Sequence, residues 1–538
     1  MDRGRIAFPV SPGYQWPETY EWKILLMGPL FHSLLAYVLL ASALQRSPWG
    51  LVEPVSLLLI VMALLVAAAG SYRPRLRFLH AVVLSALSAF TVVELILLYR
   101  APMDRVPASI AAMRRDAWAG YESLSMLLII AVLLSAAVGM WLSMRRRLPE
   151  HVAWTALGAF TVMELSLLYL SPTESMPFPI TVILIVVGCV VMSYGWTGMP
   201  GGRYRFPIIV GLYLLLGGSM VHGWNPPPID VWQFQQEAAG RLLSGENPYA
   251  SEYGNHADAQ FYGADMVKNG KVQSFPYPPL SLLLALPGYL EGDVRWSLLV
   301  ATAVSASFMV AAGRRLGVPP GHAAEMAAAA ILYHPRELFV LQMSWTEPFL
   351  FLAICVSAWA IAGPRQTIAG FALAAAATVK QYGVVWILPA WSTGRLPWRK
   401  MIPGAVAAGL LMLPFLLWDP KAFWRGTVHF QISGPFRPDS LTVLSAVYLL
   451  TGTRLPSALG FIAAILMTWF VIRRPTKDLA TAVLGEAAIL LAFFAFNKVG
   501  DMNYYWLINA VLALALVVSA AGQRAVEATE LAIQKPRG

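Results

Sequence analysis

The sequence predicts an all-α integral membrane protein, a polytopic bundle of about sixteen transmembrane helices. Of the 538 residues, 58% are hydrophobic and only 13% are charged, which leaves too little polar surface for a water-soluble protein of this size. Apolar runs near the ~20 residues needed to cross a bilayer recur along the whole chain. The net charge of +10 comes from short basic clusters between these runs, which is typical of membrane loops and not of a nucleic-acid-binding surface.

The expected spans fix an orientation in the plasma (inner) membrane. They cover approximately 24–44, 52–70, 78–99, 122–143, 152–170, 178–196, 206–222, 294–313, 321–334, 346–362, 366–380, 382–394, 401–418, 456–472, 479–496 and 503–521. Basic clusters at 73–77, 145–147, 314–315, 395–400 and 473–477 then lie on one side, so that both termini are expected in the cytoplasm. Cys189 and Cys355 lie within apolar runs, which excludes a disulfide framework and a cysteine-based metal site.

The first 204 residues form a separate region with an internal duplication. The segment ALSAFTVVELILLY at 86–99 recurs as ALGAFTVMELSLLY at 156–169, so a helical hairpin is expected twice, at about 52–99 and 122–169. Each copy carries one carboxylate within the membrane, Glu94 and Glu164. Such residues are costly to bury, and they are either bonded to neighbouring helices or part of a transport path.

A long outer loop, from Val221 to about Arg295, holds the first candidate site residue. In WNPPPIDVWQF, three prolines precede Asp230. The apolar spacing over 230–245 predicts an amphipathic helix that lies in the membrane interface and ends at Gly245. A second apolar piece at 278–290 is too short to cross a bilayer and is expected along the same surface. Asp230 is either a helix cap or a functional carboxylate at this surface.

Polar side chains gather at the outer ends of several expected helices, an inventory that suits transfer of a group from a lipid phosphate. Asp230 is the candidate general base, and His429 can orient the acceptor or bind the leaving phosphate. The candidate cations for the phosphate are Lys380, Arg336, Arg437 and Lys498. Three of these side chains can also have a simpler role: Lys380 can snorkel from a helix end, Arg336 can pair with Glu337, and His429 can simply be solvated.

From about residue 205 to the C-terminus the chain resembles the GT-C superfamily of membrane glycosyltransferases, most closely the polyprenyl-phosphate-mannose-dependent α-mannosyltransferases. The resemblance rests on Asp230 in the first large outer loop, followed in order by GENPY, YPPL, KQY, an outer H…RPDS segment and NK…YY. It implies a GT-C module over 205–538 with two interfacial helices near 230–244 and 279–290. The motif residues expected to contact substrate are Asn247, Tyr249, Tyr277, Gln381, Tyr382, Tyr504 and Tyr505.

The function implied by the resemblance is inverting transfer of a sugar, most readily mannose, from a polyprenyl-phosphate donor to a hydroxyl of a glycolipid or cell-envelope glycan on the outer face. Asp230 would be the general base, His429 a second catalytic residue and Lys380 a phosphate contact. No cofactor or divalent metal is expected, since the first loop reads PPPIDVW and lacks a D-x-D motif. Tyr504 and Tyr505 also match an interfacial aromatic belt. The alternatives are a flippase that uses Glu94 and Glu164 and a scaffold with a degenerate enzyme fold.

Overall fold

The computed structural model describes residues 202–518 except 224–225, 228, 255–261, 319–322, 333–334, 439, 441, 474–477, 502 and 516. The duplicated hairpin, Glu94 and Glu164 lie outside the described residues, and with them the residues of the flippase alternative. Of the described region, 75% is helical and the one sheet in it has three strands of two residues each. The expected all-α class is therefore confirmed.

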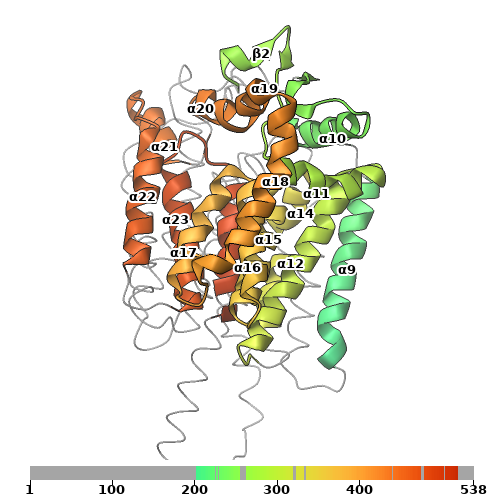
Figure 1. Ribbon diagram of the computed structural model, residues 1–538, viewed down its shortest axis with the longest axis vertical. Coiled ribbons are helices and arrows are strands. Elements are labelled where there is room, and N and C mark those ends of the chain that lie inside the picture. The colour runs from blue at the N-terminus through green and yellow to red at the C-terminus, as the bar shows by residue number, and fades with distance from the viewer. Residues whose placement is uncertain are drawn as a thin grey trace, which may run out of the picture.

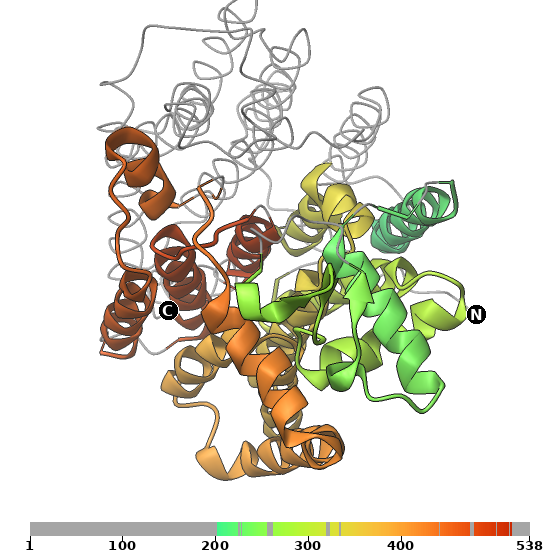
Figure 2. The same ribbon diagram turned by 90° about the horizontal axis from the view of Figure 1, so that it is seen from above.

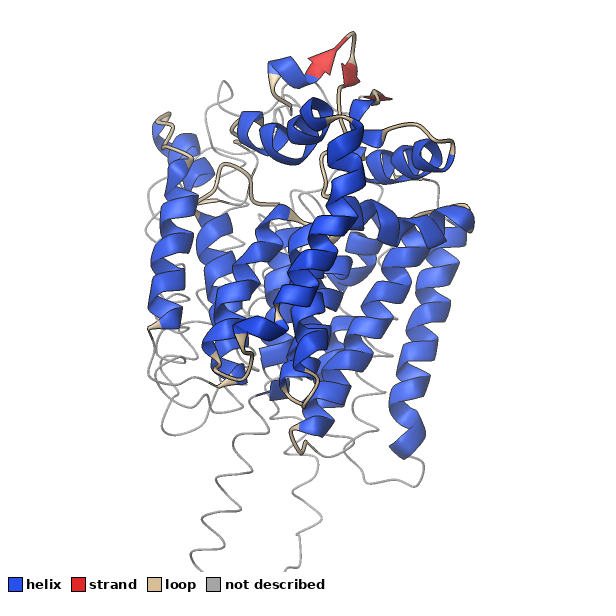
Figure 3. Cartoon of the chain, in the orientation of Figure 1, coloured by secondary structure: helices blue, strands red, loops and turns tan. Residues whose placement is uncertain are grey.

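A bundle of roughly parallel and antiparallel helices forms the larger layer (Figures 1 and 3). Its helices are α9 (Gly202–Gly223), α12 (Arg295–Arg315), α13 (Ala323–Leu332), α14 (Pro335–Gln342), α15 (Glu347–Ile361), α16 (Gln366–Val379), α17 (Ile387–Ser392), α18 (Ile402–Trp418), α22 (Ala458–Ile472), α23 (Leu479–Ala495) and a last helix from residue 503. Short 3-10 turns, η6 (Gln381–Trp386) and η7 (Trp398–Lys400), precede α17 and α18.

A smaller layer covers one end of the bundle, and Figure 2 looks down on it. It contains α10 (Asp230–Leu243), η3 (Pro248–Ala250), η5 (Ala264–Met266), α11 (Pro279–Leu290), α19 (Pro420–Trp424), the π-helical turn η8 (Arg425–His429), α20 (Phe430–Ser433) and α21 (Val443–Thr451). The strands β1 (Tyr253–Gly254), β2 (Val267–Lys268) and β3 (Lys271–Val272) pair antiparallel in the order β1-β3-β2. We call this layer the cap.

The expected count of sixteen crossings is not confirmed. Two described helices, Arg295–Arg315 and Trp398–Trp418, are long and apolar enough to cross a membrane. Helices occur at the other expected positions after residue 205, but several are short: α13 has 10 residues and α17 has 6. At 1.5 Å per residue these reach about 15 Å and 9 Å, well below the ~30 Å of a hydrocarbon core. The turns at residues 343–346 and 393–397 lie at or between the ends of expected spans, whereas α14 forms where no span was expected.

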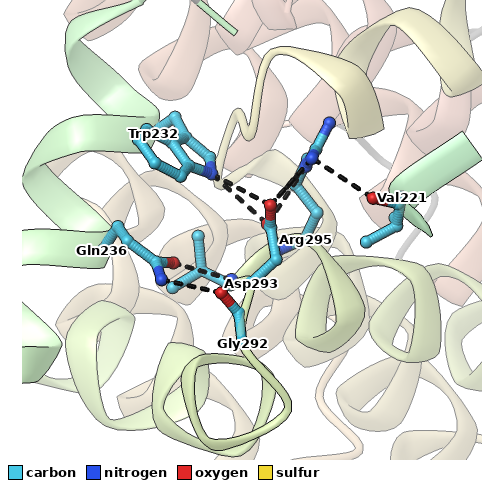
Figure 4. A network of polar contacts seen from close by, with 7 residues as sticks. Val221, Trp232, Gln236, Gly292, Asp293 and Arg295 are labelled. Carbon is cyan, nitrogen blue, oxygen red and sulfur yellow. Dashed lines mark hydrogen bonds and ion pairs between the residues drawn. The ribbon is translucent and has the colours of Figure 1, made fainter. Parts of the chain in front are cut away.

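The two expected interfacial helices are present with nearly the expected bounds, as α10 and α11. A polar network docks α10 on the turn between α11 and α12 (Figure 4). The indole N–H of Trp232 donates to the Asp293 carboxylate at 3.3 Å, and the buried Arg295 guanidinium donates to the same carboxylate at 2.8–3.0 Å. Gln236 donates to the carbonyl of Gly292 at 3.0 Å. This network fixes the direction in which α10 leaves the bundle.

A separate aromatic core stabilises the cap. Tyr249, Tyr253 and Phe275 are fully buried in it. Tyr249 packs edge to face against Phe275, Phe415 and other rings at centroid distances of 5.0–5.8 Å, a favoured geometry for aromatic pairs. The loop after α10 is thereby held on the end of α18 although it contains little regular structure.

Candidate functional site

Asp230 is the first residue of α10, at the boundary between the cap and the bundle. Ile229 occupies the N-cap position and makes no side-chain cap bond. The half-buried Asp230 carboxylate accepts the main-chain N–H of Val231 on Oδ1 at 2.8 Å and the hydroxyl of Tyr262 on Oδ2, also at 2.8 Å. Asp230 is therefore not the N-cap itself; one carboxylate oxygen accepts an N–H of the first turn, and a tyrosine 32 residues away orients the other.

Tyr262 is a donor that stays protonated. Burial and the neighbouring Asp230 carboxylate raise the pKa of the Tyr262 hydroxyl well above its ordinary value, because a phenolate would be poorly solvated and would face a negative charge. Its ring packs edge to face on Phe234 at 6.5 Å and on Phe430 at 5.8 Å. The aromatic core of the cap therefore fixes the direction of the hydrogen bond to Asp230.

His429 lies on the same layer, one residue before Phe430, which contacts Tyr262. The imidazole Nε2 makes a short hydrogen bond with Oδ2 of Asp265 in η5. Both side chains are exposed, His429 at 41% and Asp265 at 58%. The hydrogen bond from His429 lowers the pKa of the Asp265 carboxyl, which is the usual effect of a donor on a carboxylate. The contact between Phe430 and Tyr262 connects the turn of His429 to Asp230, and no described hydrogen bond joins the two side chains directly.

Lys380 is buried, and its charge has a partner. Its Nζ donates to Oε1 of Glu347 at 2.5 Å, and Lys380 and Glu347 have side chains that are 5% and 0% exposed. The same oxygen accepts the hydroxyl of Tyr382 at 2.6 Å and the Nδ2 of Asn503 at 2.7 Å. A buried carboxylate needs this set of donors to remain charged. Lys380 does not snorkel, and its first partner is Glu347.

Three tyrosine rings surround the Lys380 ammonium. Tyr277, Tyr382 and Tyr504 each lie 5.6 Å from Nζ to ring centroid, within cation–π range. Desolvation and the Asp230 and Glu347 carboxylates raise the pKa of the Tyr277 hydroxyl. Tyr277 is thus close enough to both carboxylates to feel their charges, and it joins the Lys380 cluster to Asp230.

Arg437 and Lys498 lie together where the segment after α20 meets the turn after α23. The main-chain N–H of Arg437 donates to the carbonyl of Lys498 at 3.2 Å, and its guanidinium pairs with Asp501 at 3.2 Å. The Lys498 ammonium donates to the carbonyls of Ile432 and Gly434 at 2.8 Å and 2.5 Å. Partial burial lowers the pKa of Lys498. Both cations are more accessible than Lys380.

Several other expected site residues have packing roles in the structure. The Asn247 side chain accepts the N–H of Tyr249 at 2.9 Å, and the buried Tyr249 hydroxyl donates to the carbonyl of Tyr277 at 2.7 Å. Gln381 donates to two main-chain carbonyls at 3.0 Å, those of Pro276 and Thr427. Together these residues join the cap to the end of α16.

The remaining expected residues are less close to Asp230. Tyr505 is 2% exposed within the bundle core, not in an exposed interfacial belt. Arg336 is in α14, but its side chain is outside the described atoms. The alternative that Arg336 pairs with Glu337 therefore lies outside the described side chains as well; Glu337 itself is buried and accepts the hydroxyl of Tyr213 at 2.6 Å.

Sequence reasoning missed four residues that the structure brings into the site: Tyr262, Asp265, Glu347 and Asn503. Glu347 had a usable signal, since an acid in the first turn of an apolar span is as costly there as Glu94 or Glu164. Tyr262 and Asp265 lie in a loop without periodic pattern, and only the folded loop places them. Within the described ranges, no group of three or more His, Cys, Asp or Glu side chains could hold a metal ion.

The arrangement offers a fixed carboxylate, an exposed imidazole and two partly exposed cations in and beside the cap. It can remove a proton from a hydroxyl at Asp230 and provide positive charge for an anion at Arg437 and Lys498. No protein-family model, no curated protein and no solved structure matches this chain.

Proposed function

We propose that this protein is a membrane glycosyltransferase that moves a sugar, most readily mannose, from a polyprenyl-phosphate donor to a hydroxyl of a glycolipid or cell-envelope glycan. The observation that carries the proposal is the environment of Asp230. A half-buried carboxylate at the start of a helix lying across the end of the bundle is held by Tyr262, whose ring contacts Phe430 next to His429. A carboxylate that served only as a cap would not need the second partner.

In the proposed reaction, Asp230 takes the proton of the acceptor hydroxyl as that oxygen forms a bond to the anomeric carbon. The bond between the anomeric carbon and the phosphate oxygen breaks, and its electron pair leaves with the polyprenyl phosphate. Attack opposite the leaving group inverts the anomeric configuration. The Tyr262 hydrogen bond orients the carboxylate, and since each carboxylate oxygen has two acceptor positions, it leaves room for the acceptor hydroxyl.

The departing phosphate requires fixed positive charge, which we assign first to Arg437 and Lys498. The Arg437 side chain keeps an exposure of 27% beside Asp501, and a guanidinium can bind phosphate in a bidentate manner. His429 can donate to the phosphate or orient the acceptor. Lys380, which was the first expectation for this role, is neutralised by Glu347, and we assign it to fixing the three tyrosines beside Asp230.

The bilayer location is part of the same proposal. Large apolar side chains are exposed along α18, among them Val406, Leu410 and Leu417 at 55%, 63% and 70%, and along α22, with Ile465 at 67%. Such contiguous apolar surface favours a lipid environment over water. We place the cap on the extracytoplasmic face of the plasma membrane, both termini in the cytoplasm, and the GT-C-like module at 205–538.

The test is sugar transfer by the full chain in nanodiscs, with polyprenyl-phosphate mannose as donor and a membrane glycolipid extract as acceptor. Asp230→Asn keeps the size and the Tyr262 partner but removes the base, so turnover is expected to fall by about 10²-fold or more with donor affinity retained. Glu291→Gln, at an exposed position after α11, is the control and should turn over normally. Full turnover by a folded Asp230→Asn variant would refute the assignment of the base.

A further inference from the structure

Two guanidinium groups lie over one indole ring at the end of the bundle away from the cap. The Cζ atom of Arg315, the last residue of α12, is 3.6 Å from the ring centroid of Trp359 in α15. The Cζ atom of Arg365, which directly precedes α16, is 5.2 Å from the same centroid. Each cation gains from the ring, but two like charges held near one ring also repel each other, so an anion that binds both would relieve that repulsion.

Neither guanidinium has a carboxylate partner among the ion pairs of the described residues. Arg315 uses one N–H for the carbonyl of Trp359 at 2.9 Å. The nearby acid Glu325 is engaged by Arg314 at 3.1 Å. Arg365 is exposed and Arg315 is half-buried. A guanidinium carries five N–H donors, so in the described part of the chain most N–H groups of Arg315 and Arg365 are not bonded to an acidic side chain.

The cluster is held rigidly. The Trp359 ring packs edge to face on Phe308 of α12 at 5.1 Å. A side chain at Gly363 would meet the Arg315 guanidinium at 2.5 Å, so the turn from α15 to α16 closes tightly around it. A preorganised guanidinium such as that of Arg315 binds a tetrahedral anion with little loss of side-chain entropy, and the exposed Arg365 adds a second cation.

The cluster lies far from Asp230. α12 begins at the turn that docks α10 (Figure 4) and is 21 residues long, which is about 31 Å at 1.5 Å per residue. α15 begins at Glu347, beside Lys380, and runs toward the same distant end, where α16 begins (Figure 1). The two sites are therefore at opposite ends of the bundle.

The surface around the cluster is amphipathic. Ile368 and Phe371, on the first two turns of α16, are 39% and 44% exposed, and Trp398 at the start of the neighbouring segment is 61% exposed. A Cβ on Gly370 would lie 2.2 Å from the carbonyl oxygen of Lys400, so the beginnings of α16 and α18 are in direct contact. Exposed basic groups, an indole and then apolar side chains occur in the order found across a membrane interface.

We propose that Arg315, Trp359 and Arg365 form a binding site for the phosphate headgroup of an anionic phospholipid, at the end of the bundle opposite the Asp230 site. The lipid phosphate accepts hydrogen bonds from both guanidinium groups, and its acyl chains lie along Ile368 and Phe371. A free phosphate ion would use the guanidinium groups alone and would gain nothing from this apolar surface. The lipid site does not depend on the proposed enzymatic activity.

The experiment measures phosphatidylglycerol binding to the purified full chain by native mass spectrometry in detergent, with phosphatidylcholine as the neutral reference lipid. Arg315→Gln combined with Arg365→Gln is expected to weaken phosphatidylglycerol binding by about tenfold or more, since hydrogen bonds to charged groups are lost. Arg454→Gln is the matched control: Arg454 also lies over aromatic rings, at 5.3 Å from Tyr448, but at the cap end. It should bind phosphatidylglycerol as the wild type does.

Three results would overturn the proposal. The first is unchanged phosphatidylglycerol binding by the folded double variant, and the second is an equal loss in Arg454→Gln, which would indicate a general effect of net charge. The third is displacement of the lipid by millimolar inorganic phosphate, which would indicate an ion site. If the double variant does not fold, Arg365→Gln alone decides, because its side chain is exposed; an unchanged affinity there also refutes the site.

Discussion

Replacing Lys380 with Met tests the buried pair at the base of the candidate site. The substitution removes one of three donors to Oε1 of Glu347 and leaves a carboxylate that is 0% exposed with only Tyr382 and Asn503 as partners. A hydrogen bond to a charged group contributes about 1.5–3 kcal/mol, and an uncompensated buried charge raises the total cost to about 3–5 kcal/mol. We expect Lys380→Met to lower the free energy of unfolding by that amount.

A second substitution removes the Glu347 charge that Lys380→Met leaves without its cationic partner. Lys380→Met with Glu347→Gln keeps two side-chain donors for a neutral amide oxygen, so most of the lost stability should return. The assay is thermal unfolding of each variant in the same lipid and detergent, with the exposed Lys421→Met as control, expected to stay within about 0.5 kcal/mol of the wild type.

The outcome separates two roles for Lys380. If the single variant unfolds at the wild-type midpoint, or if the double variant is no more stable than the single one, the buried-pair assignment is refuted. Donor affinity of the double variant is the further readout. If the double variant regains stability and keeps its donor affinity, Lys380 has a positioning role beside Tyr277. If it regains stability but loses donor affinity, Lys380 contacts the donor phosphate directly.

Three further predictions concern the cap. Tyr262→Phe should lower turnover by about tenfold with little change in stability, because it removes only the hydroxyl that orients Asp230; wild-type turnover would argue against that orientation. The lowered pKa of Asp265 means that its contact with His429 stabilises the folded cap above the ordinary carboxyl pKa and is lost as the pH falls through the lowered value. The free energy of unfolding, measured as a function of pH, should fall over this range, and Asp265→Asn should abolish the fall. Gly426→Ala would place a Cβ 2.2 Å from a main-chain carbonyl oxygen of the cap, so it should displace the turn that carries the imidazole and lower turnover more than Gly409→Ala, where the Cβ meets nothing.

Two helices of the cap, α10 and α11, were predictable because their signals are local. Three prolines before Asp230 and Gly245 after the amphipathic stretch bound α10, and prolines begin α11. Such residues restrict the backbone of their own turn whatever the rest of the chain does. The same reasoning gave the bounds of α15, α16 and α23 to within one residue at each end, because these apolar runs end where polar and turn-forming residues begin. It missed α14, which lies between two expected spans.

The candidate site also contains residues that the local sequence predicts and contacts that it does not predict. The sequence by itself determined that Asp230 begins a helix in an outer loop and that Lys380 ends one, because both follow from apolar runs and the residues that interrupt them. Only the tertiary structure decided that Tyr262 orients Asp230, that Glu347 neutralises Lys380, and that Arg315 and Arg365 share one indole. The physical reason is that each of these contacts depends on the packing of segments far apart in the chain, and the residue types at one position carry no information about which distant side chain will reach it.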